Sequence, residues 1–346
     1  MCNIAGYVGS RQAAPILIDM MRRQEGWDCG HYTGMATLSG GKLYVKKDVG
    51  NMDMVFGNVD LSTLPGTIGF IHSRTPGSPG QENAAWAHPF IGNGGEFAYI
   101  QNGYPGAFAG TAVQERERAY KELTDAGYYF DTWENTCVGE KNRMPDGRYI
   151  HSTELKCQLV QKWMDEGMDP RKAAEKAAFS MPSEVVGLGL TVKEPDSILW
   201  WRINYPMFAG FADHGIYLAT TPQAIPEDAR NVTLLQPLST GRVYRDRIET
   251  VPNTKTDITV APITPGVWKA CIEAMETALG EKQMHHDALD RLIRPLFSQA
   301  TCPPESAVNY AIMTQFQNQG RLEITRTERP GTAPNSTAPK LYARLK

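Results

Sequence analysis

The chain of 346 residues is long for a single hydrophobic core and favours one large domain plus a smaller one. Its formal net charge of -3 excludes a protein that is basic throughout, so any contact with nucleic acid would have to be local. Six scattered cysteines, without a Cys-x-x-Cys pair or a Cys/His cluster, predict neither a zinc site nor a disulfide framework. We expect no metal and no other cofactor.

Targeting signals are not expected either. No charged start precedes an apolar segment, and no apolar stretch approaches the roughly 18 residues that a membrane span requires. We therefore expect a cytoplasmic protein in a reducing compartment, without a membrane partner.

The first half of the chain is expected to alternate between strands and helices. Helical spacing of apolar residues predicts helices at 15–23 and 115–126. Short apolar runs predict strands at 4–8, 67–72 and 96–100, and a hairpin across 35–47. The strands at 67–72 and 96–100 end in polar residues, and catalytic groups are often found at such ends.

A polar insertion from 131 to about 152 separates these elements from a helical pair. Leu155, Leu159 and Trp163 share one face of the first helix, and the second helix is expected at 170–179. A second block of strands follows at 185–192, 198–202, 207–211, 216–219 and 242–244. Helices between two blocks of strands predict stacked layers, not repeating βαβ units.

The C-terminal quarter has a different pattern. Prolines punctuate a linker, which we place at 252–265 after a first domain at 1–251. The remaining segment, 266–346, is expected to form three helices, at 267–279, 287–298 and 305–319, and two alternating strands at 321–326 and 340–345. This order predicts a small winged-helix-like α/β domain.

Cys2 is the most informative single residue. If Met1 is removed, which the small side chain at position 2 should permit, Cys2 carries both a thiol and a free α-amine. Nucleophile and general base can then come from one residue, and an α-amine with a pKa near 8 suits that task. The alternative is a small hydrophobic residue that starts an edge strand.

Several segments give Cys2 a context. The chain opens with Cys2-Asn3-Ile4-Ala5-Gly6. It then carries, in this order, Glu25–Gly30, Gly69–Arg74, the pair His88-Pro89 and Ile100–Gly103. Together they resemble the class II glutamine amidotransferases, and most closely the glutaminase domain of glucosamine-6-phosphate synthase. The resemblance spans about residues 2 to 250 and implies an α+β fold, the four-layer αββα sandwich of N-terminal-nucleophile hydrolases.

The resemblance also implies roles for individual residues. Cys2 would be the nucleophile, and the Asn102 side-chain amide with the Gly103 backbone N–H would form the oxyanion hole. Arg74 would grip the α-carboxylate of glutamine, because a guanidinium can bind a carboxylate through two hydrogen bonds. Without the resemblance, Asn102-Gly103 is typical of a tight turn and Arg74 of a surface position after a strand.

Two further positions are expected to stabilise the structure and to take no part in proton transfer. His72 lies at the end of its strand and is expected to be hydrogen-bonded scaffolding. Asp28 is expected to stabilise the loop after the first helix and to take no part in catalysis.

The sequence departs from the family pattern where the substrate should be held. Thr75 stands where the family has an aromatic residue after Arg74, and Gly77 stands where the family has a side chain that helps to hold the substrate. Ser152 stands where the family has an aspartate that binds the α-ammonium. A serine can hydrogen-bond an ammonium group but cannot neutralise it. Two explanations stay open: either Asp131 or Asp146 restores the charge, or the substrate lacks a free α-ammonium.

The C-terminal segment limits the choice of partners. It is shorter than about a hundred residues and has no phosphate-binding glycine loop, so we expect a stand-alone amidohydrolase or a subunit of a separate synthase. Its terminal hairpin is locally basic and could contact nucleic acid, or it could serve packing or homo-oligomerisation. The basic residues are Arg321, Arg326, Arg329, Lys340, Arg344 and Lys346.

Two functional hypotheses result. In the first, Cys2 releases ammonia from glutamine or a related amide through a γ-acyl thioester, for transfer to an unknown acceptor. In the second, the protein is a non-catalytic or altered-substrate relative that binds nucleic acid or a partner through its C-terminal domain.

Overall fold

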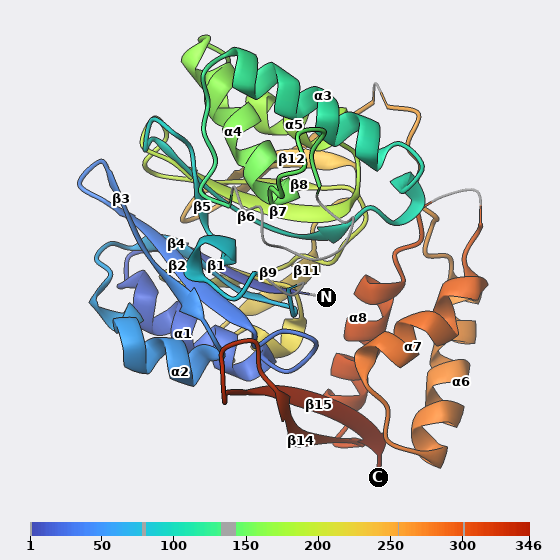
Figure 1. Ribbon diagram of the computed structural model, residues 1–346. Helices are drawn as coiled ribbons and strands as arrows, with labels where there is room; N and C mark the ends of the chain where they lie inside the picture. The colour runs from blue at the N-terminus through green and yellow to red at the C-terminus, as the bar shows by residue number, and fades with distance from the viewer. Residues whose placement is uncertain (1, 78–80, 133–142, 255, 300–301) are drawn as a thin grey trace.

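The computed structural model describes residues 2–77, 81–132, 143–254, 256–299 and 302–346, and its core is a pair of antiparallel sheets (Figure 1). The first sheet has the strand order β11-β9-β10-β1-β4-β2-β3. Its strands are β1 (Asn3–Gly9), β2 (Tyr32–Ser39), β3 (Lys42–Val49), β4 (Ile68–Arg74), β9 (Phe208–Ala212), β10 (Gly215–Ala219) and β11 (Arg230–Leu234).

The second sheet has the order β13-β12-β8-β7-β6-β5. Its strands are β5 (Phe90–Ile91), β6 (Phe97–Tyr104), β7 (Glu184–Thr191), β8 (Ile198–Arg202), β12 (Ser239–Val243) and β13 (Ile248–Pro252). The central strand β7 is buried at every position, because the sheet is covered on both faces.

The two sheets pack face to face. Ile4 and Phe70 of the first sheet share one hydrophobic cluster with Ile100, Leu188 and Trp200 of the second. Alternation along the strands directs the other set of side chains outward, towards the helices on either side. The packing explains why these apolar runs read as strands that are buried throughout.

Helices cover the outer face of each sheet, as Figure 1 shows. The first sheet is covered by α1 (Ala13–Gln24) and α2 (Met52–Val59), and the second by α3 (Ala112–Asp125), α4 (Ser152–Asp165) and α5 (Pro170–Ser180). Trp163 of α4 and Trp201 of β8 lie in the same cluster of buried residues. Among the described residues, no helix is long and apolar enough to cross a membrane.

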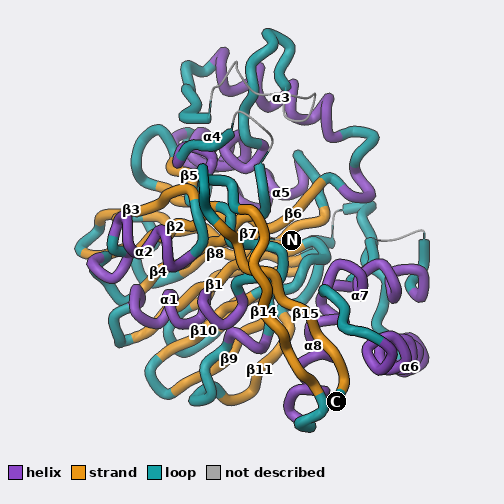
Figure 2. The backbone as a smooth tube through the Cα atoms, turned by 60° about the horizontal axis from the view of Figure 1, so that its bottom comes forward, coloured by secondary structure: helices purple, strands orange, loops and turns teal. Residues whose placement is uncertain are grey.

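The C-terminal segment packs beside the sheets and does not build a core apart from them. It contains α6 (Pro265–Glu281), α7 (His286–Ile293), α8 (Glu305–Asn318) and the hairpin β14 (Leu322–Pro330) with β15 (Thr337–Leu345). Met275 and Tyr310 belong to the same hydrophobic cluster as Leu17 of α1. In Figure 2 the hairpin crosses the face of the molecule near α8, and the backbone N–H of Leu341 donates to the carbonyl of Gly26 at 2.9 Å.

Most of the predicted elements are present at shifted ends, and a few elements were missed. The predicted linker begins at the last residue of β13, because Ile248–Pro252 pairs with β12. Helix α2 was missed because it is short and contains Gly57 and five residues of lower helical propensity, although Asn51 caps it by accepting the Met54 N–H at 2.9 Å. The five are Asp53, Val55, Phe56, Asn58 and Val59.

Candidate active site

Cys2 lies directly before β1, at the point where the two sheets approach each other. Its backbone N–H donates to Oδ1 of Asn102 on β6 at 3.1 Å, and its Sγ lies 3.8 Å from Oγ1 of Thr75. β1 pairs with β4 on one side and with β10 on the other, so the cysteine is anchored by a strand inside the sheet. The edge-strand alternative for Cys2 is therefore wrong.

Asn102 and Gly103 lie in β6, opposite Val186 and Val185 of β7, and not in a turn. A Cβ atom at position 103 would lie 2.6 Å from the carbonyl oxygen of Glu184, so only glycine fits without a shift of the backbone. The Asn102 Nδ2 is buried and has no hydrogen-bond partner among the described residues. A buried donor without a partner destabilises a protein. A ligand oxygen beside Cys2 that accepts from this nitrogen would remove that cost.

Arg74 ends β4 and is buried, with 8 % of its surface exposed. Its guanidinium donates to the carbonyl of Trp86 at 3.2 Å and lies 4.6 Å from the ring centre of Tyr32. Burial lowers the pKa of Arg74, and no carboxylate within the described part of the chain forms an ion pair with it. A buried guanidinium without a counterion favours an anionic ligand.

One cavity brings several of the sequence-predicted residues together. It is lined by Cys2, Arg74, Thr75, Gly103 and Ser152. The residues expected to act as nucleophile, as one oxyanion donor and as carboxylate ligand therefore line the same cavity as the altered position 152.

Other candidates lie elsewhere. Gly77 packs against the hydroxyl of Tyr32, and neither Asp131 nor Asp146 lines this cavity. The Asp146 carboxylate accepts a hydrogen bond from the Tyr120 hydroxyl at 2.7 Å. Residues 133–142 of the polar insertion lie outside the described residues.

Sequence reasoning missed Lys156, which lies in the wall of this cavity. Its Nζ donates to Oγ of Ser183 at 2.9 Å, and burial lowers its pKa to about 7. Lys156 follows Ser152 by four residues on α4, so the two side chains lie on the same face of the helix. That spacing was the available signal. Arg116 and Glu115 also line the cavity, and Glu115 forms an ion pair with Arg118 at 2.5 Å.

His72 stabilises the strand that carries Asn102. Its Nε2 lies 3.0 Å from the carbonyl oxygen of Gln101, next to Asn102, and burial lowers its pKa to about 3. A neutral ring that donates from Nε2 therefore holds β4 against β6. This contact agrees with the expected scaffolding role.

A second cavity is also lined by Cys2. Cys2, Thr75 and Gly103 line it from the sheets, and Asp287 and Arg294 line it from the C-terminal segment. Arg294 is held by ion pairs to Glu184 at 2.9 Å and to Glu305 at 2.7 Å. The C-terminal segment thus completes the surroundings of Cys2.

Comparison with known proteins gives several sequence relatives. No family model matches the chain. The glutamine--fructose-6-phosphate aminotransferase of Methanothermobacter thermautotrophicus is 30% identical over 240 residues, which cover 68% of this chain and 35% of that protein. The enzyme of the same name from Pyrococcus horikoshii is 31% identical over 250 residues, covering 71% of this chain and 37% of that protein. The chain therefore spans about a third of the length of these relatives.

Solved structures share the fold at lower identity. The glutamine phosphoribosylpyrophosphate amidotransferase of B. subtilis, solved with ADP and GMP, superposes with a TM-score of 0.58 at 14% identity, covering 78% of this chain and 52% of that one. The sequence relatives and the shared fold together identify the chain as a homologue of the class II glutamine amidotransferases, an enzyme family with the N-terminal-nucleophile fold.

Proposed function

We propose that this protein hydrolyses a carboxamide with Cys2 as an N-terminal nucleophile, in a four-layer αββα sandwich, and releases ammonia. The observation that carries the proposal is the Asn102 amide. Its Oδ1 accepts the Cys2 N–H at 3.1 Å while its Nδ2 is buried without a partner among the described residues. A preorganised donor is thus held beside the sulfur, where a tetrahedral oxyanion would form.

The proposed reaction needs removal of Met1. The Cys2 α-amine then takes the thiol proton, and the sulfur attacks the carboxamide carbon. Asn102 Nδ2 and the Gly103 N–H stabilise the oxyanion, and collapse of the intermediate breaks the C–N bond. The nitrogen leaves as ammonia with the proton from the amine, and water then hydrolyses the thioester to a carboxylic acid.

The cavity supports a substrate that lacks a free α-ammonium. Ser152 cannot neutralise a cation, and Lys156 lies one helical turn away. Among the described residues, Glu115 supplies the one carboxylate of the lining, and it is paired with Arg118. Arg74 still offers a site for a carboxylate. Of the two explanations for Ser152, the geometry therefore favours a changed substrate, such as an ω-amide of a dicarboxylic acid, over a restored charge at Asp131 or Asp146.

The acceptor of the ammonia and the partners stay proposals. We retain a separate synthase subunit, homo-oligomerisation, and a winged-helix-like role of residues 266–346 in nucleic-acid contact as hypotheses. The hairpin supports the last of these only in part. Most of β14 is exposed, but the Arg329 guanidinium donates to the carbonyl of Asp28 at 2.9 Å, and Arg321 forms an ion pair with Glu276 at 2.8 Å.

Mass spectrometry of the intact chain tests the nucleophile. Treatment with an electrophilic glutamine analogue should give one adduct on Cys2, with Met1 absent. Cys2→Ala should give none, whereas Cys271→Ala, which changes a buried cysteine on α6, should react like the wild type. An adduct that persists in Cys2→Ala would contradict the mechanism.

Ammonia release tests the substrate class. L-glutamine and glutaramate differ only in the α-amino group, and we expect the wild type to prefer glutaramate. A preference for L-glutamine would contradict the changed-substrate proposal and leave the Cys2 mechanism standing.

A further inference from the structure

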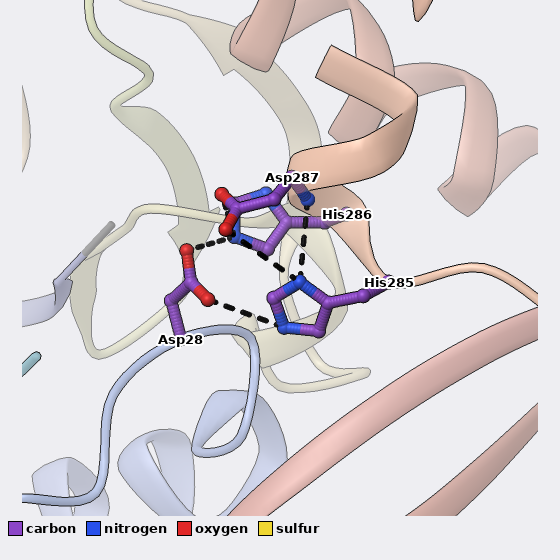
Figure 3. Close-up of side chains that lie close together, drawn as sticks. All are labelled: Asp28, His285, His286 and Asp287. Carbon is purple, nitrogen blue, oxygen red and sulfur yellow. Dashed lines mark hydrogen bonds and ion pairs between the residues drawn. The ribbon is translucent and has the colours of Figure 1, made fainter. Parts of the chain in front are cut away.

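Four ionisable side chains meet where the loop after α1 touches the start of α7. Asp28 comes from the loop, and His285, His286 and Asp287 come from three consecutive positions at the first turn of the helix (Figure 3). Each offers one ligand atom, and these atoms lie within 4.8 Å of one another. We propose that this cluster binds one divalent transition-metal ion of the zinc type, a role distinct from amide hydrolysis.

The spacing of the ligand atoms fits four-coordinate binding. The Asp28 Oδ2 lies 2.9 Å from His286 Nε2, and the Asp28 Oδ1 lies 3.3 Å from His285 Nε2. The Asp287 Oδ1 lies 3.5 Å from His286 Nε2. Zinc bonds of about 2.1 Å in a tetrahedron place neighbouring ligand atoms about 3.4 Å apart, so an ion fits without a large rearrangement.

One imidazole nitrogen of the cluster lacks a well-formed hydrogen bond and so points to a missing ligand. His285 is 6 % exposed, and its Nε2 has no hydrogen-bond partner of suitable geometry among the described residues. A buried polar atom without a partner is uncommon in a folded protein and calls for an explanation such as an ion. His285 Nε2 is directed to the Asp28 carboxylate, into the centre of the cluster (Figure 3).

Outer groups would orient both imidazoles. The Asp290 Oδ2 lies 3.7 Å from Nδ1 of the fully buried His286, and Asp290 is itself fixed by Asn309 Nδ2 at 2.7 Å. The Asp287 Oδ2 lies 3.9 Å from His285 Nδ1. Zinc bound at His285 Nε2 requires the neutral tautomer whose proton has moved from Nε2 to Nδ1. The Nδ1–H would then donate to that carboxylate, and Nδ1 would no longer accept from the Asp287 N–H at 3.4 Å.

The donor set and the access route favour a transition metal. Two imidazole nitrogens with two carboxylate oxygens suit zinc, whereas calcium and magnesium prefer oxygen ligands alone. Asp28 and Asp287 line the second cavity beside Cys2, which provides a path for the ion. The ion would join two segments that are more than 250 residues apart in the sequence and brace the C-terminal segment against the Cys2 site.

Zinc retention by the full-length chain tests the proposal. The chain is freed of metal with a chelator, incubated with ZnCl2, passed through a desalting column and analysed for zinc. We expect one zinc per wild-type chain and a visible absorption spectrum of tetrahedral type when Co2+ replaces zinc. The His285→Ala/His286→Ala double variant should retain none.

Asp287→Asn keeps the test decisive if the double histidine variant does not fold, because Asp287 is half-exposed and the change is isosteric. Its zinc affinity should fall at least as far as the roughly 10–100-fold loss that follows removal of an outer hydrogen-bond partner. His214→Gln, in a histidine–carboxylate pair with Asp228 outside the cluster, is the matched control and should bind like the wild type. A wild type that retains no zinc, or an Asp287→Asn variant with unchanged affinity, overturns the proposal.

Discussion

The two ends of the cavity beside Cys2 differ in how much of the family pattern they keep. At the end proposed for the reaction, Cys2 and Gly103 line the cavity, and the Asn102 side chain accepts the Cys2 N–H. Arg74 also lines this end and is buried without a counterion among the described residues. At the far end, Ser152 replaces an acid and Lys156 adds a buried amine. The proposed groups for bond cleavage and the altered groups for substrate choice thus lie on different walls of the cavity, so the proposal allows one set to change while the other is kept.

Loss of the Asn102 amide should have the largest effect. Asn102→Ala removes the unpaired Nδ2 and is expected to lower kcat about 10²–10³-fold with little change in KM, because the oxyanion forms only in the transition state. Steady-state ammonia release measures both constants. Asn58→Ala, at an exposed position on α2, should behave like the wild type. An unchanged kcat in Asn102→Ala would contradict the proposed oxyanion role of the Asn102 amide.

Substitution of Arg74 should act on binding instead. Arg74→Lys keeps the charge but loses the fork that binds a carboxylate through two hydrogen bonds, so KM should rise about 10–100-fold with a smaller change in kcat. Titration with glutaramate gives KM. Arg22→Lys, at an exposed position on α1, serves as the control. If Arg74→Lys lowers kcat and leaves KM unchanged, Arg74 does not bind the substrate carboxylate.

The burial of Lys156 should be detectable in the pH dependence of the free energy of unfolding. Its pKa is about 7 in the folded protein, below the ordinary value of 10.5, so the unfolded state binds more protons between pH 7 and 10.5. The wild type should therefore gain stability from this group as pH rises through that window. Lys156→Met removes the penalty and should be more stable at pH 7, on the order of 2 kcal/mol, with a much smaller difference at pH 10, where the unfolded lysine approaches its own pKa of 10.5.

Urea unfolding of both proteins at pH 7 and pH 10 measures that difference. Lys172→Met, at an exposed position on α5, should show no such pH dependence. An equal free energy of unfolding for Lys156→Met and the wild type at pH 7 would show that the lysine is not buried as the structure places it.

The smallest effect should come from restoring the family's charge at the far end. The double variant Ser152→Asp/Lys156→Met supplies an acid and removes the amine, so its preference should shift towards L-glutamine over glutaramate by about tenfold. The ratio of kcat/KM for the two amides measures the shift. Asp146→Asn should not change the ratio, because Asp146 does not line the cavity; a change in Asp146→Asn would revive the restored-charge explanation.

Local patterns predicted much of the framework. The alternation and apolar runs at 4–8 and 67–72 correspond to β1 and β4, and helical spacing around Leu155 and Trp163 corresponds to α4. Short or exposed elements escaped prediction, among them β11, whose first four residues are all exposed. Such elements are stabilised by pairing with a neighbouring strand, which a single stretch of sequence does not reveal.

The sequence by itself predicted that Cys2, Arg74 and Asn102-Gly103 belong to one catalytic pattern, because their order along the chain resembles that of the class II glutamine amidotransferases. Tertiary structure alone decided which groups share a space. It placed Lys156 in the cavity wall, kept Asp131 and Asp146 out of the lining, and brought Asp28 to His286 at 2.9 Å. Contacts between residues far apart in the chain depend on how sheets and helices pack, and no spacing along the sequence encodes them.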